Sequence, residues 1–210
     1  MNDRTSDYRR VQLPLSREVA RDLTLGEVVT LTGEITTTIG LPTHKRILDY
    51  MAADRPLPLD LDGSLFHLSI CSREAGDGLE PLYVNPTTST RFNALLPAII
   101  RRYGLHALSG KGGLGPECVA AMQETGCVYF SMVGGSSALL SLGVKEIIAT
   151  AWDDLIMQFR VSRVRLEDFG PLTVAIDAHG NSLYEKLSQT ARDRLPDIMA
   201  RLNAGRMPAR

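Results

Sequence analysis

The sequence has few cysteines, few aromatic residues and almost no net charge, and each shortage argues against a class of function. The three cysteines, Cys71, Cys118 and Cys127, are odd in number and widely spaced. They therefore predict neither a disulfide framework nor the closely spaced ligands of most zinc and iron–sulfur sites, and we assign no metal ligand to this chain. Only 6% of the residues are aromatic, and 23 basic side chains are balanced by 24 acidic ones. This composition gives no indication that the protein binds nucleic acid.

Long apolar runs are missing as well. Residues 95–100 form one of the longest, which is far too short to cross a bilayer, and the polar first sixteen residues contain no signal-peptide core. We therefore expect a cytoplasmic protein that does not enter a membrane. The 210 residues, 44% of them hydrophobic, are enough for one sizeable core.

The first half of the chain predicts short elements joined by turns. Residues 1–12 are expected to be a flexible arm, after which Ser16 caps a short helix over residues 17–22. β-Branched residues favour a strand over residues 27–38, and Thr43 is a suitable cap for the helix that follows it. A short strand over residues 64–70 and a polar loop over residues 72–80 are then expected. A second short strand follows at residues 82–84 and a helix at residues 93–103.

The second half predicts an alternation of strands and helices. Strands are expected at residues 105–109, 127–132 and 146–151, with helices at residues 116–125 and 137–142. This β–α–β–α order is typical of a parallel sheet layered with helices, so we expect an α/β fold. Two more strands are expected at residues 160–166 and 172–176. A long amphipathic helix over residues 181–203 is expected to follow them.

Four segments combine glycine, proline or hydroxyl groups with polar side chains next to a predicted strand or helix. They are THKR (43–46), NPTTSTR (85–91), GKGGLG (110–115) and VGGSS (133–137). Ligands of layered α/β folds bind at such junctions. Each segment also has a plain structural interpretation, as a turn or as close packing of a helix on a sheet.

NPTTSTR and GKGGLG carry groups that fit a small anion. Thr87 and Thr88 offer hydroxyls, and Arg91 offers a planar fork of donors that matches a carboxylate or a phosphate. Lys111 adds a point charge where glycines let the backbone approach a ligand closely. The order of these glycines differs from that of a phosphate-binding P-loop.

THKR adds two further candidates. His44 can act as an acid, a base or a hydrogen-bonding group, and Arg46 adds positive charge. Together the four segments predict a cationic, hydroxyl-lined pocket for a small anion. They contain no nucleophile–base pair and no carboxylate dyad, so the chemistry of this chain is incomplete by itself.

The order of these segments resembles a known family. The chain contains LPLSREVARDLTLGEVVTLTGEI, THKR, PLPLDLDG, PTTSTR, GKGGLGP, VYFSMVGGSSALL and EDFGPLTVAIDAHGN, followed by Leu183-Tyr184. Over about residues 11–185 it is similar to the β subunits of L(+)-tartrate dehydratase and to the C-terminal domains of class I fumarases.

That resemblance implies a fold, an activity and a partner. The fold is a swivelling β/β/α domain, here over residues 13–185, with residues 186–210 as a C-terminal helix and tail of the same domain. The activity is that of a hydro-lyase, which adds or removes water reversibly at a small carboxylic acid such as fumarate or tartrate. A partner α subunit holds a [4Fe–4S] cluster in an α2β2 assembly, and this chain contributes residues to the shared site.

The resemblance also implies roles for individual residues. Thr87 matches a threonine that works beside the catalytic base, and we expect His44 to be catalytic as well. Arg91 and Lys111 match residues that grip substrate carboxylates. Substrate binding is therefore expected of Arg91, Lys111, Thr88 and Arg46.

One departure from the family concerns the substrate. Relatives carry an Arg-Asp pair just before the histidine, whereas this chain has Ile39-Gly40 near that place. The sequence leaves open whether the substrate carries a substituted carbon, lacks one carboxylate, or is held by Arg46 instead. It also leaves open a non-catalytic carboxylate-binding or regulatory module that has kept the pocket.

Overall fold

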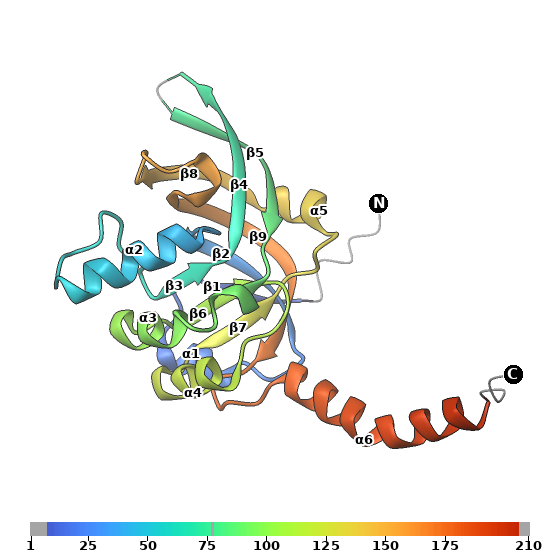
Figure 1. The fold of residues 1–210 in the computed structure, drawn as a ribbon. Helices are drawn as coiled ribbons and strands as arrows, with labels where there is room; N and C mark the ends of the chain where they lie inside the picture. The colour runs from blue at the N-terminus through green and yellow to red at the C-terminus, as the bar shows by residue number, and fades with distance from the viewer. Residues whose placement is uncertain (1–7, 77, 206–210) are drawn as a thin grey trace, which may run out of the picture.

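The computed structural model describes residues 8–76 and 78–205 (Figure 1). Its elements are β1 (Arg9–Gln12), α1 (Arg17–Asp22), β2 (Val28–Thr37), α2 (Leu41–Ala52), β3 (Ser64–Phe66), β4 (Leu68–Ala75), β5 (Gly78–Pro86), the 3₁₀ helix η1 (Ser89–Phe92), α3 (Leu96–Tyr103), β6 (Ala107–Gly110), α4 (Pro116–Thr125), β7 (Val128–Ser131), α5 (Ser137–Ser141), β8 (Val144–Ala151), the 3₁₀ helix η2 (Met157–Phe159), β9 (Val161–Ile176) and α6 (Leu183–Ala204). Within these ranges, no helix combines the length and the apolar character that a membrane span needs.

Five strands close into a barrel. β2 pairs with β3, β3 with β6, β6 with β7 and β7 with β9, and an antiparallel ladder between β9 and β2 completes the ring. β1 and β8 extend the sheet beside β2 and β9. Strands β3, β6 and β7 are parallel. This confirms the parallel direction that the alternation of strands and helices predicted for β6 and β7. The prediction is wrong for β8, the third strand of that alternation, which pairs antiparallel with β9, the strand that follows it in the chain. The architecture is mixed α/β, which confirms the expected class and adds a closed barrel to it.

Alternate residues of the parallel strands belong to two different cores. Phe66 and Phe130 pack with apolar residues of β2 and β9. Leu65 and Leu108 point the other way and pack with apolar residues of α2, α3 and α4, which lie beside these strands in Figure 1. Side chains of a strand alternate between its two faces, so short apolar strands can support both cores at once.

Several predicted element boundaries are confirmed. α1 begins after Ser16, whose hydroxyl accepts a hydrogen bond from the Val19 amide. α4 spans the predicted Pro116–Thr125. Gly104 ends α3 and Gly126 ends α4, both in the left-handed conformation that glycine adopts readily.

The expected arm at the N-terminus is wrong for its last residues. Arg9–Gln12 forms β1, which pairs in parallel with β2, while residues 1–7 lie outside the described ranges. A four-residue strand next to prolines carries little signal of its own, because its pairing partner lies far along the chain.

The expected start of α2 is also wrong. The helix begins at Leu41, so Gly40 rather than Thr43 is its N-cap residue. Pro42 fits the first turn, where its missing amide costs no helical hydrogen bond. The Thr43 hydroxyl donates to the Phe159 carbonyl instead, a contact from η2 that local sequence cannot reveal.

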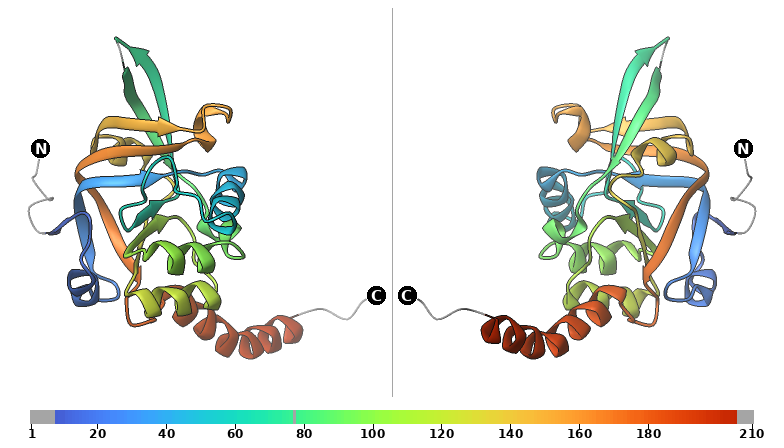
Figure 2. Two further views of the ribbon diagram at one scale, coloured as in Figure 1. Left: turned by 90° about the vertical axis from the view of Figure 1, so that its left-hand side faces the viewer. Right: turned by 90° about the vertical axis from the view of Figure 1, so that its right-hand side faces the viewer.

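A polar loop is expected over residues 72–80, but residues 72–76 and 78–80 belong to the outer part of a β4–β5 hairpin, and residue 77 lies outside the described ranges. Figure 2 shows this hairpin rising from the body of the molecule. Arg73 and Glu80 pair across it, with 2.7 Å between Nε and Oε2. Because most of the outer hairpin is exposed, its strands need no apolar alternation, and their polar residues resemble those of a loop.

The two strands expected at residues 160–166 and 172–176 are one strand, β9, of sixteen residues. The polar stretch between them is an irregular part of this strand, where Asp168 has a φ of 47°. β9 pairs with β8 along its first half and with β7 along its second, while β2 runs beside both halves. Pairing with these partners holds the strand together where local propensity favours a turn.

The C-terminal helix α6 leads away from the body of the molecule (Figures 1 and 2). It begins at Leu183 after Ser182, whose hydroxyl accepts from the Glu185 amide, and it contains Pro196. Every residue of this helix from Glu185 onward is exposed. The predicted amphipathic helix is therefore confirmed, with boundaries shifted by one or two residues.

Candidate functional site

The segments that contain Thr87 and Lys111 lie side by side at neighbouring strand ends. β5 ends at Pro86 and β6 at Gly110. The Lys111 amide donates to the Thr87 carbonyl at 3.0 Å, and the Ser89 amide donates to the Lys111 carbonyl at 2.9 Å. This pairing places the hydroxyls of NPTTSTR and the cation of GKGGLG on adjacent stretches of backbone.

Glycine is required where these two segments touch. A Cβ atom at Gly110 would collide with the Ser89 hydroxyl and lie 3.0 Å from the Thr87 carbonyl oxygen. Gly112 adopts a φ of 71°, which side chains disfavour. The glycines predicted to allow close approach to a ligand thus first allow close approach of the two segments to each other.

VGGSS joins the same group of strand ends. The Met132 amide, just after β7, donates to the Gly110 carbonyl at 2.8 Å. The Ser137 hydroxyl donates to the Asn85 side-chain oxygen at 2.8 Å. A Cβ atom at Gly134 would lie 3.7 Å from the Lys111 Nζ, so the lysine side chain extends along this loop. Three of the four predicted segments therefore meet.

Arg91 and Lys111 have no carboxylate partner among residues 8–76 and 78–205. Arg91 is exposed, and Lys111 is half-buried. Many other surface arginines form ion pairs, such as Arg101 with Glu124 at 2.6 Å. Cations held next to hydroxyls and free of internal partners can receive the carboxylate of a ligand.

Arg46 is engaged elsewhere. Its two terminal nitrogens donate to the two carboxylate oxygens of Asp154 at 2.8 and 2.7 Å, and its guanidinium lies 5.4 Å from the centre of the Trp152 ring. The edge of the guanidinium between its two terminal nitrogens is therefore occupied by Asp154. Within the described part of the chain, no hydrogen bond joins the Arg46 side chain to Thr87, Arg91 or Lys111.

No space is left for a side chain at Gly40, in the Ile39-Gly40 segment where the sequence departs from the family. A Cβ atom at Gly40 would lie 2.9 Å from the Phe159 Cβ and would collide with the Thr43 hydroxyl. A side chain at this position would displace Phe159 of η2. The aromatic ring of Phe159 therefore lies next to the backbone position where relatives are expected to carry a charged pair.

His44 lies inside the protein, with no exposed surface. Its ring stacks on Phe92 with 4.0 Å between ring centres, and its Nδ1 lies 2.7 Å from the Gly40 carbonyl oxygen. Burial lowers the pKa of His44 to about 4, although the bond to Gly40 acts in the opposite direction. The imidazole is neutral at physiological pH and is shielded from solvent by the chain itself.

A second buried histidine, His67, was not among the predicted site residues. Its Nε2 lies 3.3 Å from the Nε2 of His44, and its Nδ1 lies 2.8 Å from the Ser89 hydroxyl oxygen. Burial, and next the neighbouring His44, hold the pKa of His67 well below 6.5. His67 lies between β3 and β4 in a stretch expected to be a plain apolar strand, so the sequence contains no signal that singles it out.

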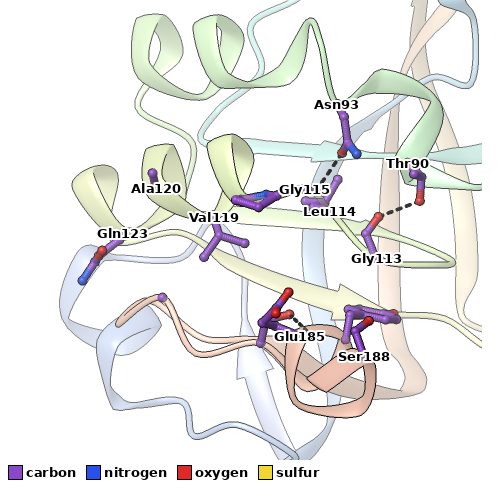
Figure 3. Close-up of a pocket in the computed structure, with 14 residues that line it drawn as sticks. Thr90, Asn93, Gly113, Leu114, Gly115, Val119, Ala120, Gln123, Glu185 and Ser188 are labelled. Carbon is purple, nitrogen blue, oxygen red and sulfur yellow. Dashed lines mark hydrogen bonds between the residues drawn. The ribbon is translucent and has the colours of Figure 1, made fainter. Parts of the chain in front are cut away.

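A pocket of about 610 Å³ adjoins these segments (Figure 3). It lies between the GKGGLG loop, the start of α4 and the start of α6. Thr90 donates to the Gly113 carbonyl at 2.8 Å, and the Gly115 amide donates to the Asn93 side-chain oxygen at 3.1 Å at its rim. Thr87, Arg91 and Lys111 are not among its lining residues, so the predicted site lies beside this pocket rather than within it.

The cysteines do not form a site for an iron–sulfur cluster. Cys118 and Cys127 are buried, and burial raises the pKa of the Cys118 thiol to about 11 and that of Cys127 further. Cys71 lies on β4, whereas Cys118 lies on α4 and Cys127 lies between α4 and β7. The described part of the chain contains no group of three or more histidine, cysteine or acidic side chains that could hold a metal ion.

Comparison with known proteins agrees with the resemblance. Residues 1–187 match the model of a family described as Fumarase C-terminus. The chain is 31% identical over 187 residues to a putative L(+)-tartrate dehydratase subunit beta of Methanocaldococcus jannaschii, covering 88% of this chain and 95% of that protein.

Two further relatives extend this comparison. The L(+)-tartrate dehydratase subunit beta of Escherichia coli K12 is 32% identical over 187 residues, covering 89% of this chain and 91% of that protein. A putative fumarate hydratase class I of Geobacillus stearothermophilus is 29% identical over 196 residues, covering 91% of this chain but 37% of that longer protein. The chain belongs to the fumarase C-terminus family.

Proposed function

We propose that this chain is the β subunit of a two-subunit [4Fe–4S] hydro-lyase, which hydrates or dehydrates a small carboxylic acid. The observation that carries the proposal is the backbone pairing of NPTTSTR with GKGGLG. In a chain whose relatives are named as tartrate dehydratase β subunits, this pairing puts two threonine hydroxyls next to cations that have no carboxylate partner in the described part of the chain.

The chain supplies binding and orientation in this proposal. Arg91 and Lys111 hold a carboxylate of the substrate and stabilise the negative charge that builds up on it. The Thr87 hydroxyl orients the group that moves the proton, and Thr88 provides a further hydrogen bond to the substrate. These roles need no ionisable acid or base from this chain.

The partner α subunit supplies the remaining chemistry. It holds the [4Fe–4S] cluster, for which the buried Cys118 and Cys127, whose thiol pKa values are raised, are unsuitable. The barrel and its helices then act as a swivelling β/β/α domain that covers the partner's site, in a heterotetramer of two α and two β subunits. This division of labour explains why the proposed site residues of this chain are cations and hydroxyls without a complete catalytic set.

The environment of Gly40 supports a particular kind of substrate. Phe159 presents an apolar ring where a charged pair is expected in relatives, and Arg46 cannot replace that charge without leaving Asp154. We infer that the substrate carries an apolar substituent on one carbon or has one carboxylate fewer. Mesaconate, a methyl-substituted analogue of fumarate, is the simplest test compound.

The test is anaerobic co-expression of this chain with a neighbouring gene that encodes a cysteine-bearing partner. Hydration or dehydration of fumarate, mesaconate and both tartrates is measured for the complex, with each chain alone as a control. We expect turnover only in the complex. A stable complex with an intact cluster and no turnover of any carboxylic acid would contradict the proposal and favour a carboxylate-binding module.

A further inference from the structure

A buried chain of side-chain hydrogen bonds runs behind the site. The Tyr129 hydroxyl lies 2.9 Å from the Ser89 Oγ and 2.9 Å from the Gly112 carbonyl oxygen. Ser89 bonds to His67 at 2.8 Å, and His67 lies 3.3 Å from His44. All four side chains are completely buried.

The partners at the ends of this chain fix the positions of its protons. The Gly40 carbonyl can only accept, so Nδ1 of His44 carries the hydrogen, and the Nε2 of a neutral His44 is an acceptor. His67 must then donate from Nε2, which leaves its Nδ1 to accept from the Ser89 hydroxyl. Tyr129 in turn donates to Ser89 or to the Gly112 carbonyl. Every member is satisfied with both imidazoles neutral.

The chain connects the segments that carry the proposed site residues. It begins at the N-cap of α2, passes through the start of the β4–β5 hairpin and ends at the GKGGLG loop. Ser89 is its contact with NPTTSTR, and it lies between Thr88 and Arg91. Within that segment Thr87 and Thr88 are half-buried and Arg91 is exposed, whereas Ser89 has no exposed surface.

We propose that His44, His67 and Tyr129 are positioning residues, which act through Ser89 to hold Thr87, Thr88 and Arg91 in place. In this arrangement His44 is not an acid–base catalyst, and His67 is a functional residue of the same site. The inference rests on the proposed function for its kinetic test, but the arrangement of protons and the effect on the loop can be measured without any activity.

The first experiment uses NMR on the full chain labelled with ¹⁵N-histidine. The protein contains four histidines, so single substitutions suffice to assign their imidazole signals. We expect hydrogen on Nδ1 of His44 and on Nε2 of His67, with both rings neutral between pH 6 and pH 8. Any other tautomer pair, or a ring that titrates with solvent in this range, would overturn the inference.

The second experiment compares His67→Phe and Ser89→Ala with Ser109→Ala. Phenylalanine has a similar size to histidine and removes both hydrogen bonds. Ser109 is an equally buried serine whose hydroxyl donates only to the Phe130 carbonyl, at 2.7 Å, and it serves as the control. We expect the backbone amide signals of Thr87, Thr88 and Arg91 to shift in the two test variants and to stay in place in the control.

The third experiment measures kinetics of the same variants in the complex with the partner subunit. Each test variant is expected to lower kcat/KM by about tenfold to a hundredfold, since each leaves at least one buried polar group without its partner. The double variant is expected to lose no more than the worse single variant, because both substitutions break one chain. Loss of thermal stability with wild-type kinetics would show a purely structural role and overturn the proposal.

Two variants of His44 distinguish a positioning role from a catalytic one. In His44→Gln, the amide oxygen can accept the hydrogen bond of His67, so this variant is expected to keep more activity than His44→Ala and to keep both limbs of the pH profile. Loss of one limb in both variants would assign acid–base catalysis to His44 and refute the inference. If the wild-type complex itself is inactive, the proposed function fails, whereas the two NMR experiments still decide the positioning.

Discussion

Gly113 is a position where the structure predicts a clear loss of stability from a single added methyl group. A Cβ atom there would lie 2.7 Å from Cγ, 3.0 Å from Cδ2 and 3.1 Å from Cβ of Tyr184. The ring cannot simply move away, because its hydroxyl is 2.8 Å from the Ser131 hydroxyl and the residue begins α6. Relieving such an overlap costs about 1–3 kcal/mol, so Gly113→Ala is expected to lower the free energy of unfolding by that amount.

Urea unfolding of the full chain measures this loss. The single tryptophan, Trp152, provides a fluorescence signal, and circular dichroism provides a second probe. The control is Gly135→Ala in the neighbouring glycine-rich loop, where an added Cβ would have no atom within 4 Å. The control is expected to change stability by less than about 0.5 kcal/mol, as is usual for surface positions.

A double-mutant cycle tests the assigned cause. Tyr184→Ala removes the ring, which makes the two closest contacts with the new methyl group, so Gly113→Ala is expected to cost much less in that background. Equal stability of Gly113→Ala and Gly135→Ala would refute the reasoning. So would a penalty that persists undiminished after Tyr184 has been removed, because the strain would then arise elsewhere.

The other predictions concern charge, pH and the C-terminal helix. In the active complex, Arg91→Ala and Lys111→Ala are each expected to lower kcat/KM by about tenfold to a hundredfold, because each loses a charged hydrogen bond to the substrate. The control Arg102→Ala, which removes only a surface ion pair, is expected to leave kcat/KM unchanged. Equal kinetics of all three variants would contradict the site. The pKa of His44 falls from 6.5 to about 4 on folding, so the unfolded chain binds more protons and stability is lost as pH falls from 6.5 toward 4, by up to roughly 1.4 kcal/mol per pH unit. The free energy of unfolding, measured with urea at several pH values in this range, should depend less steeply on pH in His44→Gln than in the wild type. An unchanged dependence on pH would argue against a buried neutral ring. Removal of residues 189–210 is expected to change the free energy of unfolding by less than about 1 kcal/mol, because the described part of this segment is exposed; loss of cooperative urea unfolding would show otherwise.

Element ends with local causes could be predicted from the sequence. Ser16 caps α1 through its own hydroxyl, and Gly126 ends α4 because glycine tolerates the left-handed conformation. The interactions that decide these ends lie within a few residues. The alternation of strands and helices likewise predicted the parallel pairing of β6 and β7, since a helical crossover requires that direction. It did not predict that β8 pairs antiparallel with β9.

Elements whose partners are distant could not be predicted in this way. β9 continues through Asp168 because β2, β7 and β8 pair with its two halves, and β1 exists because β2 offers it an edge. The tip of the β4–β5 hairpin has an exposed, polar sequence that also fits a loop. For β1 and β9 the pairing partners lie mostly far along the chain. In the hairpin tip the partners are close in sequence, but the exposed polar residues give no strand pattern.

The sequence by itself determined which chemical groups are available and in what order: the hydroxyl of Thr87, the cations of Arg91 and Lys111, and the glycines that let their segments approach. It also determined the family, because the ordered motifs carry that information. Only the tertiary structure decided that Arg46 pairs with Asp154 and that His44 is buried against His67. Whether a polar side chain faces a ligand or the core depends on strands and loops that come together only when the barrel closes, and local sequence does not encode that environment.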